Sequence, residues 1–295
     1  MKRPASGQIS GLEFAAFVLP VCVMITYAFY APFLMSMAYS FMKWNGISSA
    51  PVFIGLKNFV DIFTKDTTFA PAAVFTVAFA GLYVLITNAL ALVLAVVLDK
   101  QMKSANLLRT VFFCPYIMSS LVVGFIWKFL LTQGFASLYG ITKWGFLNWS
   151  WLGTSQLAFS SIVIVSVWQS IGFYVVIYLA GLQSVPVEVM EAAAIDGAVA
   201  ARGFFAVKFP LLGPSITVCM FMSFTNAIKV FDVIISLTDG GPGGSTRSVT
   251  IDVYTDAFQN NMYGYGSAKA LILFGVVVLV TFFLLRFFKA REVEA

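Results

Sequence analysis

Few residues in this sequence could carry out acid/base or metal chemistry. The chain has 295 residues and no histidine, and Cys22, Cys114 and Cys219 each lie inside an apolar run without CxxC spacing. Zinc sites and acid/base catalysis rely heavily on histidine, and the scattered carboxylates form no converging catalytic group. We therefore expect no catalytic residue, no metal site and no enzyme activity in this chain.

Polar residues inside a long apolar stretch are more informative. Ser223, Asn226 and Val230 follow one another in steps of three and four residues, so a helix would place them on one face. Polar side chains at membrane depth usually face a cavity or a neighbouring helix. Ser223 and Asn226 are therefore candidates for ligand binding, with hydrogen bonding between helices as the alternative. Asn88, alone in another apolar run, is expected to hold helices together.

Two charges occur in the same stretch as Ser223 and Asn226. Lys229 and Asp232 are three residues apart and could form an ion pair on another side of the helix. Charges at this depth are functional candidates by default, but a pair that guides helix packing is at least as good an interpretation. We expect a structural or gating role for both.

A second pattern lies in the segment 186–209, which separates two apolar runs. Glu188 and Glu191 complement the positive end of a helix dipole, alanines favour a helix, and Gly197 can end it with a positive φ. A second short helix is predicted over 199–209. Periodicity alone leaves two interpretations open, a helical hairpin on the membrane surface or a coupling element that docks into a soluble partner.

The composition defines the elements that must position these residues. The chain is 60% hydrophobic and 11% charged, against about 25% charged residues in soluble domains, and its mean hydropathy is +0.91. Continuous apolar runs predict an all-α membrane protein with six transmembrane helices, at 12–41, 72–98, 110–131, 157–183, 211–236 and 266–288. We expect one transmembrane domain over 12–288, flanked by cytoplasmic termini at 1–11 and 289–295, and a loop at 132–156.

The charges of the chain indicate its orientation in the membrane. The net charge of +5 comes from cations at the ends of apolar runs rather than from one patch, so membrane lipid, and not nucleic acid, is the expected partner. More lysines and arginines fall on the side of the termini than on the other side, which predicts both termini in the cytoplasm. The segment 186–209 then faces the cytoplasm.

Three stretches of the sequence resemble a known family. Glu191, Ala192 and Ala193, with Gly197 and Pro210 at the matching spacing, resemble the EAA motif of ABC importer permeases. LTDGGPGGSTRS at 237–248, which follows KVFD at 229–232, is similar to the LT-x-GGP sequence of carbohydrate-type permeases such as those for maltose and glycerol-3-phosphate. FIGLKNF at 53–59 looks like the first outer loop of the same family.

This resemblance implies a fold, partners and a location. The fold is the type I permease fold of ABC importers, in the bacterial inner membrane. The implied partners are a second, different permease subunit, two ATP-binding subunits that hold ATP and Mg, and an extracytoplasmic solute-binding protein. Because the chain has no GxxxxGK[ST] phosphate loop, we expect it to bind no cofactor itself.

The resemblance also implies roles for particular residues. Glu191, Ala192, Ala193, Asp196 and Gly197 would couple the chain to an ATPase.

The substrate path would be lined by Ser223, Asn226 and Val230. Weaker candidates are Gln169 and, because aromatic faces can stack on a sugar ring, Tyr116 and Trp168. Gly240, Gly241 and Pro242 would form a tight turn with a structural or gating role.

Together these features favour an importer permease for a sugar or related polyol. Glycerol-3-phosphate or another non-sugar solute is the alternative cargo, in which case Lys229 or Arg247 could attract a phosphate. An ion-coupled secondary transporter is less favoured because only Asp232 is an acidic residue clearly within a span.

Overall fold

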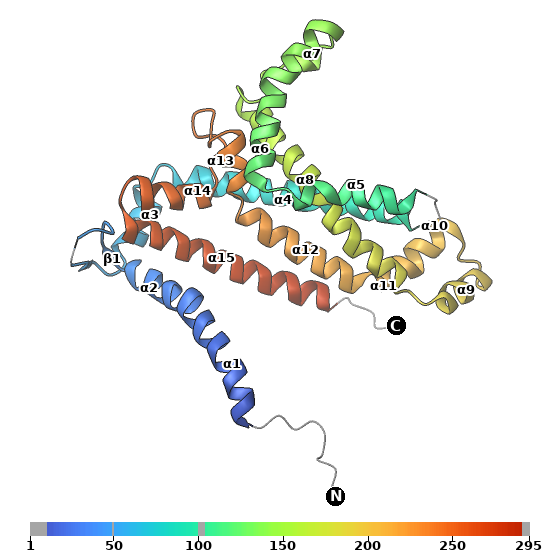
Figure 1. Ribbon diagram of the computed structural model, residues 1–295, viewed down its shortest axis with the longest axis horizontal. Coiled ribbons are helices and arrows are strands. Elements are labelled where there is room, and N and C mark those ends of the chain that lie inside the picture. Colours follow the sequence, from blue (N-terminus) through green and yellow to red (C-terminus); the bar gives the residue numbers. More distant parts are fainter. Residues whose placement is uncertain (1–10, 49, 100–103, 291–295) are drawn as a thin grey trace, which may run out of the picture. The chain divides into compact units, whose positions relative to one another are not determined.

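The computed structural model describes residues 11–48, 50–99 and 104–290 of the chain (Figure 1). The predicted terminal segments fall largely outside this part, at residues 1–10 and 291–295. The chain divides into two compact units, and each is described by itself. The first comprises the chain up to Thr64 together with Tyr254–Leu271, and the second comprises Lys65–Val253 and the chain from Ile272 onward.

The first unit combines an apolar N-terminal helix with a short polar segment. Its elements in chain order are α1 (Gly11–Ile25), η1 (Thr26–Tyr30), α2 (Ala31–Tyr39), β1 (Met42–Lys43), β2 (Val52–Phe53), α3 (Lys57–Thr64), η5 (Thr255–Gln259) and the start of α15 (Tyr263–Lys289). The two strands pair antiparallel. Asn58 donates to the carbonyls of Ser40 and Met42, and buried Lys269 pairs with Asp256 at 2.5 Å. These contacts satisfy polar groups that would otherwise be costly to bury.

The second unit is a helical bundle that contains every candidate site residue. Its elements in chain order are α4 (Phe69–Leu98), α5 (Ala105–Ile117), α6 (Ser120–Phe129), η2 (Leu130–Gly134), α7 (Phe135–Thr142), η3 (Gly145–Asn148), α8 (Ser155–Gln183), α9 (Val187–Ile195), α10 (Ala200–Gly203), η4 (Phe204–Lys208), α11 (Phe209–Leu211), α12 (Gly213–Ile228), α13 (Asp232–Leu237), α14 (Val249–Tyr254) and the rest of α15.

The core of this unit lies along α4 and α8, which pack side by side (Figure 1). Phe79 and Ile162 belong to one buried cluster, and Tyr174 and Leu212 belong to another. Gly172 allows α5 to cross α8 closely, because a Cβ at this position would lie 2.0 Å from the carbonyl oxygen of Phe112. Small residues at such crossings let membrane helices approach each other.

The predicted all-α membrane fold is confirmed. In the part of the chain that the structure describes, five helical stretches are long and apolar enough to cross a membrane, namely Phe14–Tyr39, Phe69–Leu98, Ser120–Thr142, Ser155–Gln183 and Tyr263–Lys289. A sixth is obtained if Ala201–Leu211 and Gly213–Ile228, which meet at an angle of 67°, count as one broken span. Four of the predicted runs match these spans closely.

The predicted boundaries are wrong for the other two runs. The run 110–131 is interrupted where α5 ends at Ile117, because the backbone is extended at Met118 and Ser119 before α6 begins at Ser120. The helix then extends to Thr142, into the region predicted to be a loop. The run 211–236 is divided as well, because α12 ends at Ile228 and α13 begins at Asp232.

Candidate functional site

The break between α12 and α13 places polar groups beside the bundle core. Phe231 has φ −140° and ψ −63°, outside the helical region. Two hydroxyl groups from a later segment contact carbonyls that the break exposes: Ser248 donates to Val230 at 2.9 Å, and Thr250 makes a weaker contact with Ile228 at 3.5 Å. Irregular backbone at membrane depth is tolerated where it is buried in protein or lines a cavity. This break lines a cavity.

A cavity of about 290 Å³ opens beside this break, between α4, α5, α6, α8 and the α12–α13 junction. Its volume is near the lower end of the range of small-molecule sites, about 300–1,000 Å³. Its polar lining consists of hydroxyl, amide and charged side chains: Tyr83, Tyr116, Ser120, Ser166, Gln169, Ser170, Asn226, Lys229 and Asp232. A cavity with this lining can hold a ligand rich in hydroxyl groups.

Five of the residues singled out from the sequence, Gln169 among them, line the cavity together with Asn226. Tyr116 stacks on Phe173 with 4.6 Å between ring centroids, and Val230 contributes to the wall. Lys229 and Asp232 both reach the cavity but form no ion pair with each other within the described chain. Their three-residue spacing does not bring them together because the helix that it assumes is interrupted between them.

Asn226 presents its amide to the cavity, and among the described residues it has one weak hydrogen-bond partner. Its Nδ2 atom lies 3.4 Å from the hydroxyl of Tyr174, at the long limit for a hydrogen bond. Much of its capacity to donate and accept therefore remains open, which suits a residue that binds a ligand.

Ser223 and Trp168 lie away from this cavity. Ser223 is completely buried and accepts a hydrogen bond from Asn88 at 2.9 Å, so the alternative interpretation of hydrogen bonding between helices describes its position. Tyr178 donates to the other side of the Asn88 amide at 2.8 Å. Trp168 lines a separate apolar pocket of about 420 Å³ and packs edge-on against Trp127. Substrate binding by Ser223 and Trp168 stays a prediction.

The wall formed by α8 was identified from the sequence only at Gln169, whereas Ser166 and Ser170 were not identified. Gln169 donates to the carbonyl of Met118 at 3.0 Å and to Ser120 at 3.1 Å, which fixes its amide across the break between α5 and α6. Tyr83 donates to Ser170 at 2.7 Å. The hydroxyl of Ser166, on the same face, is buried and has no hydrogen-bond partner in the described chain. The i, i+3 and i+4 spacing of Ser166, Gln169 and Ser170 was the available signal.

The segment 237–248 forms a compact turn after α13. Gly240 has φ +77°, a conformation that favours glycine, and the amide of Gly241 donates to the carbonyl of Thr238 at 2.9 Å. The hydroxyl of Thr246, buried inside the turn, donates to the carbonyl of Gly241 at 2.6 Å. Pro242 follows within the same turn, and none of these residues lines the cavity.

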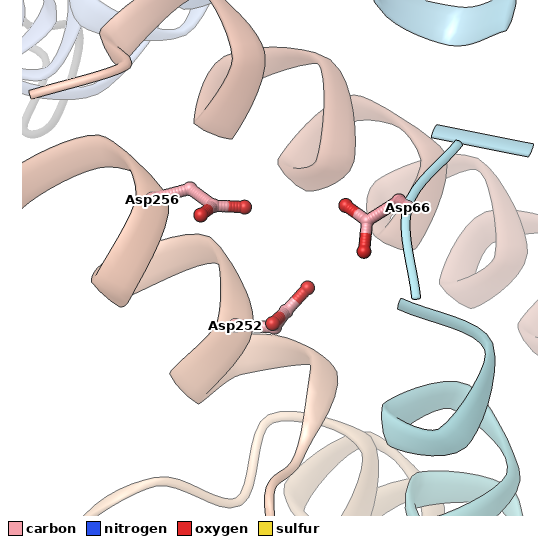
Figure 2. A group of neighbouring side chains, drawn as sticks. All are labelled: Asp66, Asp252 and Asp256. Carbon is pink, nitrogen blue, oxygen red and sulfur yellow. The ribbon is translucent and has the colours of Figure 1, made fainter. Parts of the chain in front are cut away.

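Two carboxylates lie close to each other beside this turn. Oxygens of Asp66 and Asp252 are within 4.8 Å, and Thr68 Oγ1 lies 2.9 Å from each residue (Figure 2). Arg247 Nε lies 2.8 Å from Asp252 as an ion pair, though it is not aligned as a hydrogen bond. Asp256, also labelled in Figure 2, belongs to the first unit, where Lys269 pairs with it. The Thr68 hydroxyl thus contacts both Asp66 and Asp252, the backbone amides of Thr68 and Phe69 donate to Asp66, and Arg247 pairs with Asp252.

The segment 186–209 contains two short helices joined at a glycine. Pro186 precedes the first turn of α9 rather than lying within it. Gly197 has φ +80°, and the amide of Ala198 donates to the carbonyl of Ala193 at 2.8 Å, which is the hydrogen bond of a Schellman motif. The second helix runs continuously through α10, η4 and α11.

The residues of the EAA pattern divide into two groups by exposure. Glu191, Ala192 and Asp196 are exposed, and the Gly197 position is open, since no atom lies within 4 Å of a Cβ built there. Ala193 is buried within the chain itself. A surface that binds another protein can therefore include the four exposed positions, 191, 192, 196 and 197. Ala193 instead packs inside the chain.

Comparison with known proteins assigns the chain to a family. Residues 88–293, more than half of the chain, match the family model described as "Binding-protein-dependent transport system inner membrane component". The chain is 36% identical to the probable starch degradation products transport system permease protein AmyD of Thermoanaerobacterium thermosulfurigenes, with all of both chains covered. It is 34% identical to the multiple sugar-binding transport system permease protein MsmF of Streptococcus mutans, with 94% of each chain covered.

A solved structure has the same fold. A chain from the crystal structure of a bacterial ABC transporter involved in the import of the acidic polysaccharide alginate superposes with a TM-score of 0.81. The match covers 94% of this chain and 95% of that chain at 19% sequence identity. At this identity the similarity shows the fold of an importer permease, and not its cargo.

Proposed function

The chain belongs to the family of binding-protein-dependent transport system inner membrane components, and from this premise we propose that it is the permease subunit of an ATP-driven importer for a sugar or oligosaccharide. The observation that carries the proposal is the polar cavity at the α12–α13 break, which Asn226 faces. Two relatives named for starch degradation products and for multiple sugars support the same class of cargo.

The chemistry of the cavity favours a neutral, hydroxyl-rich cargo. Neutral hydroxyl and amide groups supply most of its polar lining, and they can donate to and accept from sugar hydroxyls. Lys229 and Asp232 contribute one charge of each sign, so the lining adds no net charge. Tyr116 offers an aromatic face that could stack on a sugar ring.

An anionic cargo such as glycerol-3-phosphate fits this cavity less well. Of the two cations considered for a phosphate, Arg247 pairs with Asp252 and is not part of the lining. Lys229 does line the cavity, but Asp232 lines it too and would repel a phosphate. We therefore favour a sugar, with glycerol-3-phosphate as the alternative.

The energy for transport comes from other subunits in this proposal. The exposed residues Glu191, Ala192 and Asp196 are the contact with one of two ATP-binding subunits that hold ATP and Mg. A second permease subunit completes the pore, and an extracytoplasmic solute-binding protein delivers the cargo. The chain lies in the bacterial inner membrane with both termini in the cytoplasm. Rigid-body movement of the bundles then exposes the cavity to one side of the membrane and then to the other.

Purification of the tagged chain from its native membrane tests this proposal. The expected result is that an ATPase subunit and a second permease subunit copurify, and that the binding protein loaded with maltotriose stimulates ATP hydrolysis. Glycerol-3-phosphate is the comparison ligand. A preparation that contains no ATPase subunit, or whose ATP hydrolysis does not respond to any loaded binding protein, would contradict the proposal.

A further inference from the structure

The coupling hairpin, formed by residues 186–211, is connected to the rest of the bundle through the chain itself, through an apolar contact and through an ion pair. The chain joins the hairpin to α8 on one side and to α12 on the other, and Phe204 packs against the buried cluster that includes Leu98 and Leu212. The connection to α12 bends by 67° between Leu211 and Gly213. Movement of the hairpin can change this bend instead of moving α12. The covalent connection to α12 alone would therefore transmit the movement poorly.

An ion pair connects the hairpin directly to the end of α4. Lys208 Nζ lies 2.6 Å from Asp99 Oδ2, and each side chain is 21% exposed. Lys208 is the last residue of η4, and Asp99 caps the C-terminus of α4. Arg109, from α5, also holds this terminus by donating to the carbonyl of Leu98 at 3.3 Å. The pair therefore joins the hairpin to a fixed point on α4.

Helix α4 leads from this point to the cavity without interruption. It is helical from Phe69 to Leu98, and Tyr83 on the same helix lines the cavity. Sixteen residues separate Tyr83 from Asp99, which corresponds to about 24 Å of helix. Between them Asn88 is hydrogen-bonded to Ser223 of α12. Movement of α4 at Asp99 would thus be transmitted to the two sides of the cavity that α4 and α12 form.

We propose that the Lys208–Asp99 ion pair transmits movement of the coupling hairpin to α4, and so links ATP hydrolysis to the opening of the cavity. The inference rests on the proposed function and adds a pair of positioning residues to it. Neither residue lines the cavity, so the pair acts through α4 rather than by contact with cargo.

The test uses the complete transporter in proteoliposomes and measures the sugar moved per ATP hydrolysed, with maltotriose as the probe. Asp99→Asn and Lys208→Gln each break the pair, and each should lower this ratio by about fivefold, the size of effect expected for a partly exposed ion pair. Lys208→Arg keeps the charge and should stay near the wild type. Lys143→Gln, which removes an exposed cation on α7's C-terminal side, is the control and should leave the ratio unchanged.

The charge swap, Asp99→Lys with Lys208→Asp, distinguishes a pair from two separate residues. It should restore at least half of the lost ratio. Ratios for the two single variants that match the wild type would overturn the inference while leaving the proposed function intact. The inference would also be overturned if the charge swap restored none of the lost ratio and Lys208→Arg lowered the ratio as much as Lys208→Gln does. If the wild-type complex itself couples no sugar movement to ATP hydrolysis, the proposed function fails instead.

Discussion

The amide of Asn88 on α4 donates a hydrogen bond to the hydroxyl of Ser223 on α12, with 2.9 Å between the two atoms. Tyr178 on α8 donates to the same amide, so one side chain joins three membrane helices. All three residues are buried. This network explains why Ser223 turns toward the neighbouring helices, whereas Asn226, three residues later, faces the cavity.

Replacing Asn88 by alanine should destabilise the bundle. The hydroxyls of Ser223 and Tyr178 would both lose a partner, at a cost of about 1–2 kcal/mol, because hydrogen bonds between membrane helices average about 0.6 kcal/mol each. The melting temperature of the purified protein in detergent measures this loss. Asn148→Ala, at the exposed last residue of η3, is the control. Equal melting temperatures for the two variants would show that the network contributes nothing.

Asn226 and Ser223 should respond differently to the same substitution. Asn226→Ala removes a group that faces the cavity, so we expect the KM of sugar uptake to rise about fivefold, with little change in melting temperature. Ser223→Ala should lower the melting temperature and leave KM within about twofold, because Ser223 lies outside the cavity. If instead Ser223→Ala raised the KM and Asn226→Ala lowered the melting temperature, the cargo would lie on the other side of α12.

Ser166 should bind cargo through a hydroxyl that is otherwise unpartnered. A buried hydroxyl with no hydrogen bond costs free energy in the empty protein, so Ser166→Ala should not lower the melting temperature. The variant should nevertheless raise the KM of uptake severalfold. Ser160→Ala, whose hydroxyl donates to the carbonyl of Gln156 on the same helix, is the matched control. An unchanged KM for Ser166→Ala would remove α8 from the binding wall.

The close crossing of α5 and α8 should not tolerate a side chain at Gly172. A Cβ there would lie 2.0 Å from the carbonyl oxygen of Phe112, which is backbone and cannot rotate away. Overpacking of this kind costs about 1–3 kcal/mol, so Gly172→Ala should lower the melting temperature clearly. Gly140→Ala, where no atom lies within 4 Å of the new methyl group, should not. Equal stability of these variants would contradict the packing described for α5 and α8.

Gly197 should be needed for coupling and not only for stability. Gly197→Ala and Gly55→Ala both place a side chain at positive φ in open space, so each should cost about 1–2 kcal/mol. Only Gly197 lies between the two helices of the coupling hairpin, so only its variant should lower the sugar moved per ATP. A similar loss of coupling in Gly55→Ala would mean that general instability, and not the hairpin, is responsible.

Much of the fold could be predicted from the sequence because apolar runs are long and continuous. The turn at Gly197 could be predicted as well, since a glycine after an alanine-rich helix is a strong local signal. The break at 229–231 contains no glycine or proline, and the groups that stabilise it, Ser248 and Thr250, come from a later segment. Such a break depends on tertiary contacts and leaves no local pattern.

The candidate site was predictable only in part for the same reason. Helical spacing put Ser223 and Asn226 on one face, but Asn88 and Tyr178 decide which of them turns inward to a neighbouring helix. Lys229 and Asp232 had the spacing of an ion pair, and the interruption of the helix between them separates them. Spacing predicts neighbours only where the helix is continuous.

Uptake of radiolabelled maltotriose into proteoliposomes tests the central claim most directly. The vesicles contain this chain with its partner permease and ATP-binding subunits, the loaded binding protein is on the opposite side, and ATP or ADP is supplied to the ATP-binding subunits. We predict sugar accumulation with ATP, none with ADP, and a raised KM when the complex carries Asn226→Ala. Accumulation that proceeds equally with ADP, or in vesicles that lack the ATP-binding subunits, would contradict the account.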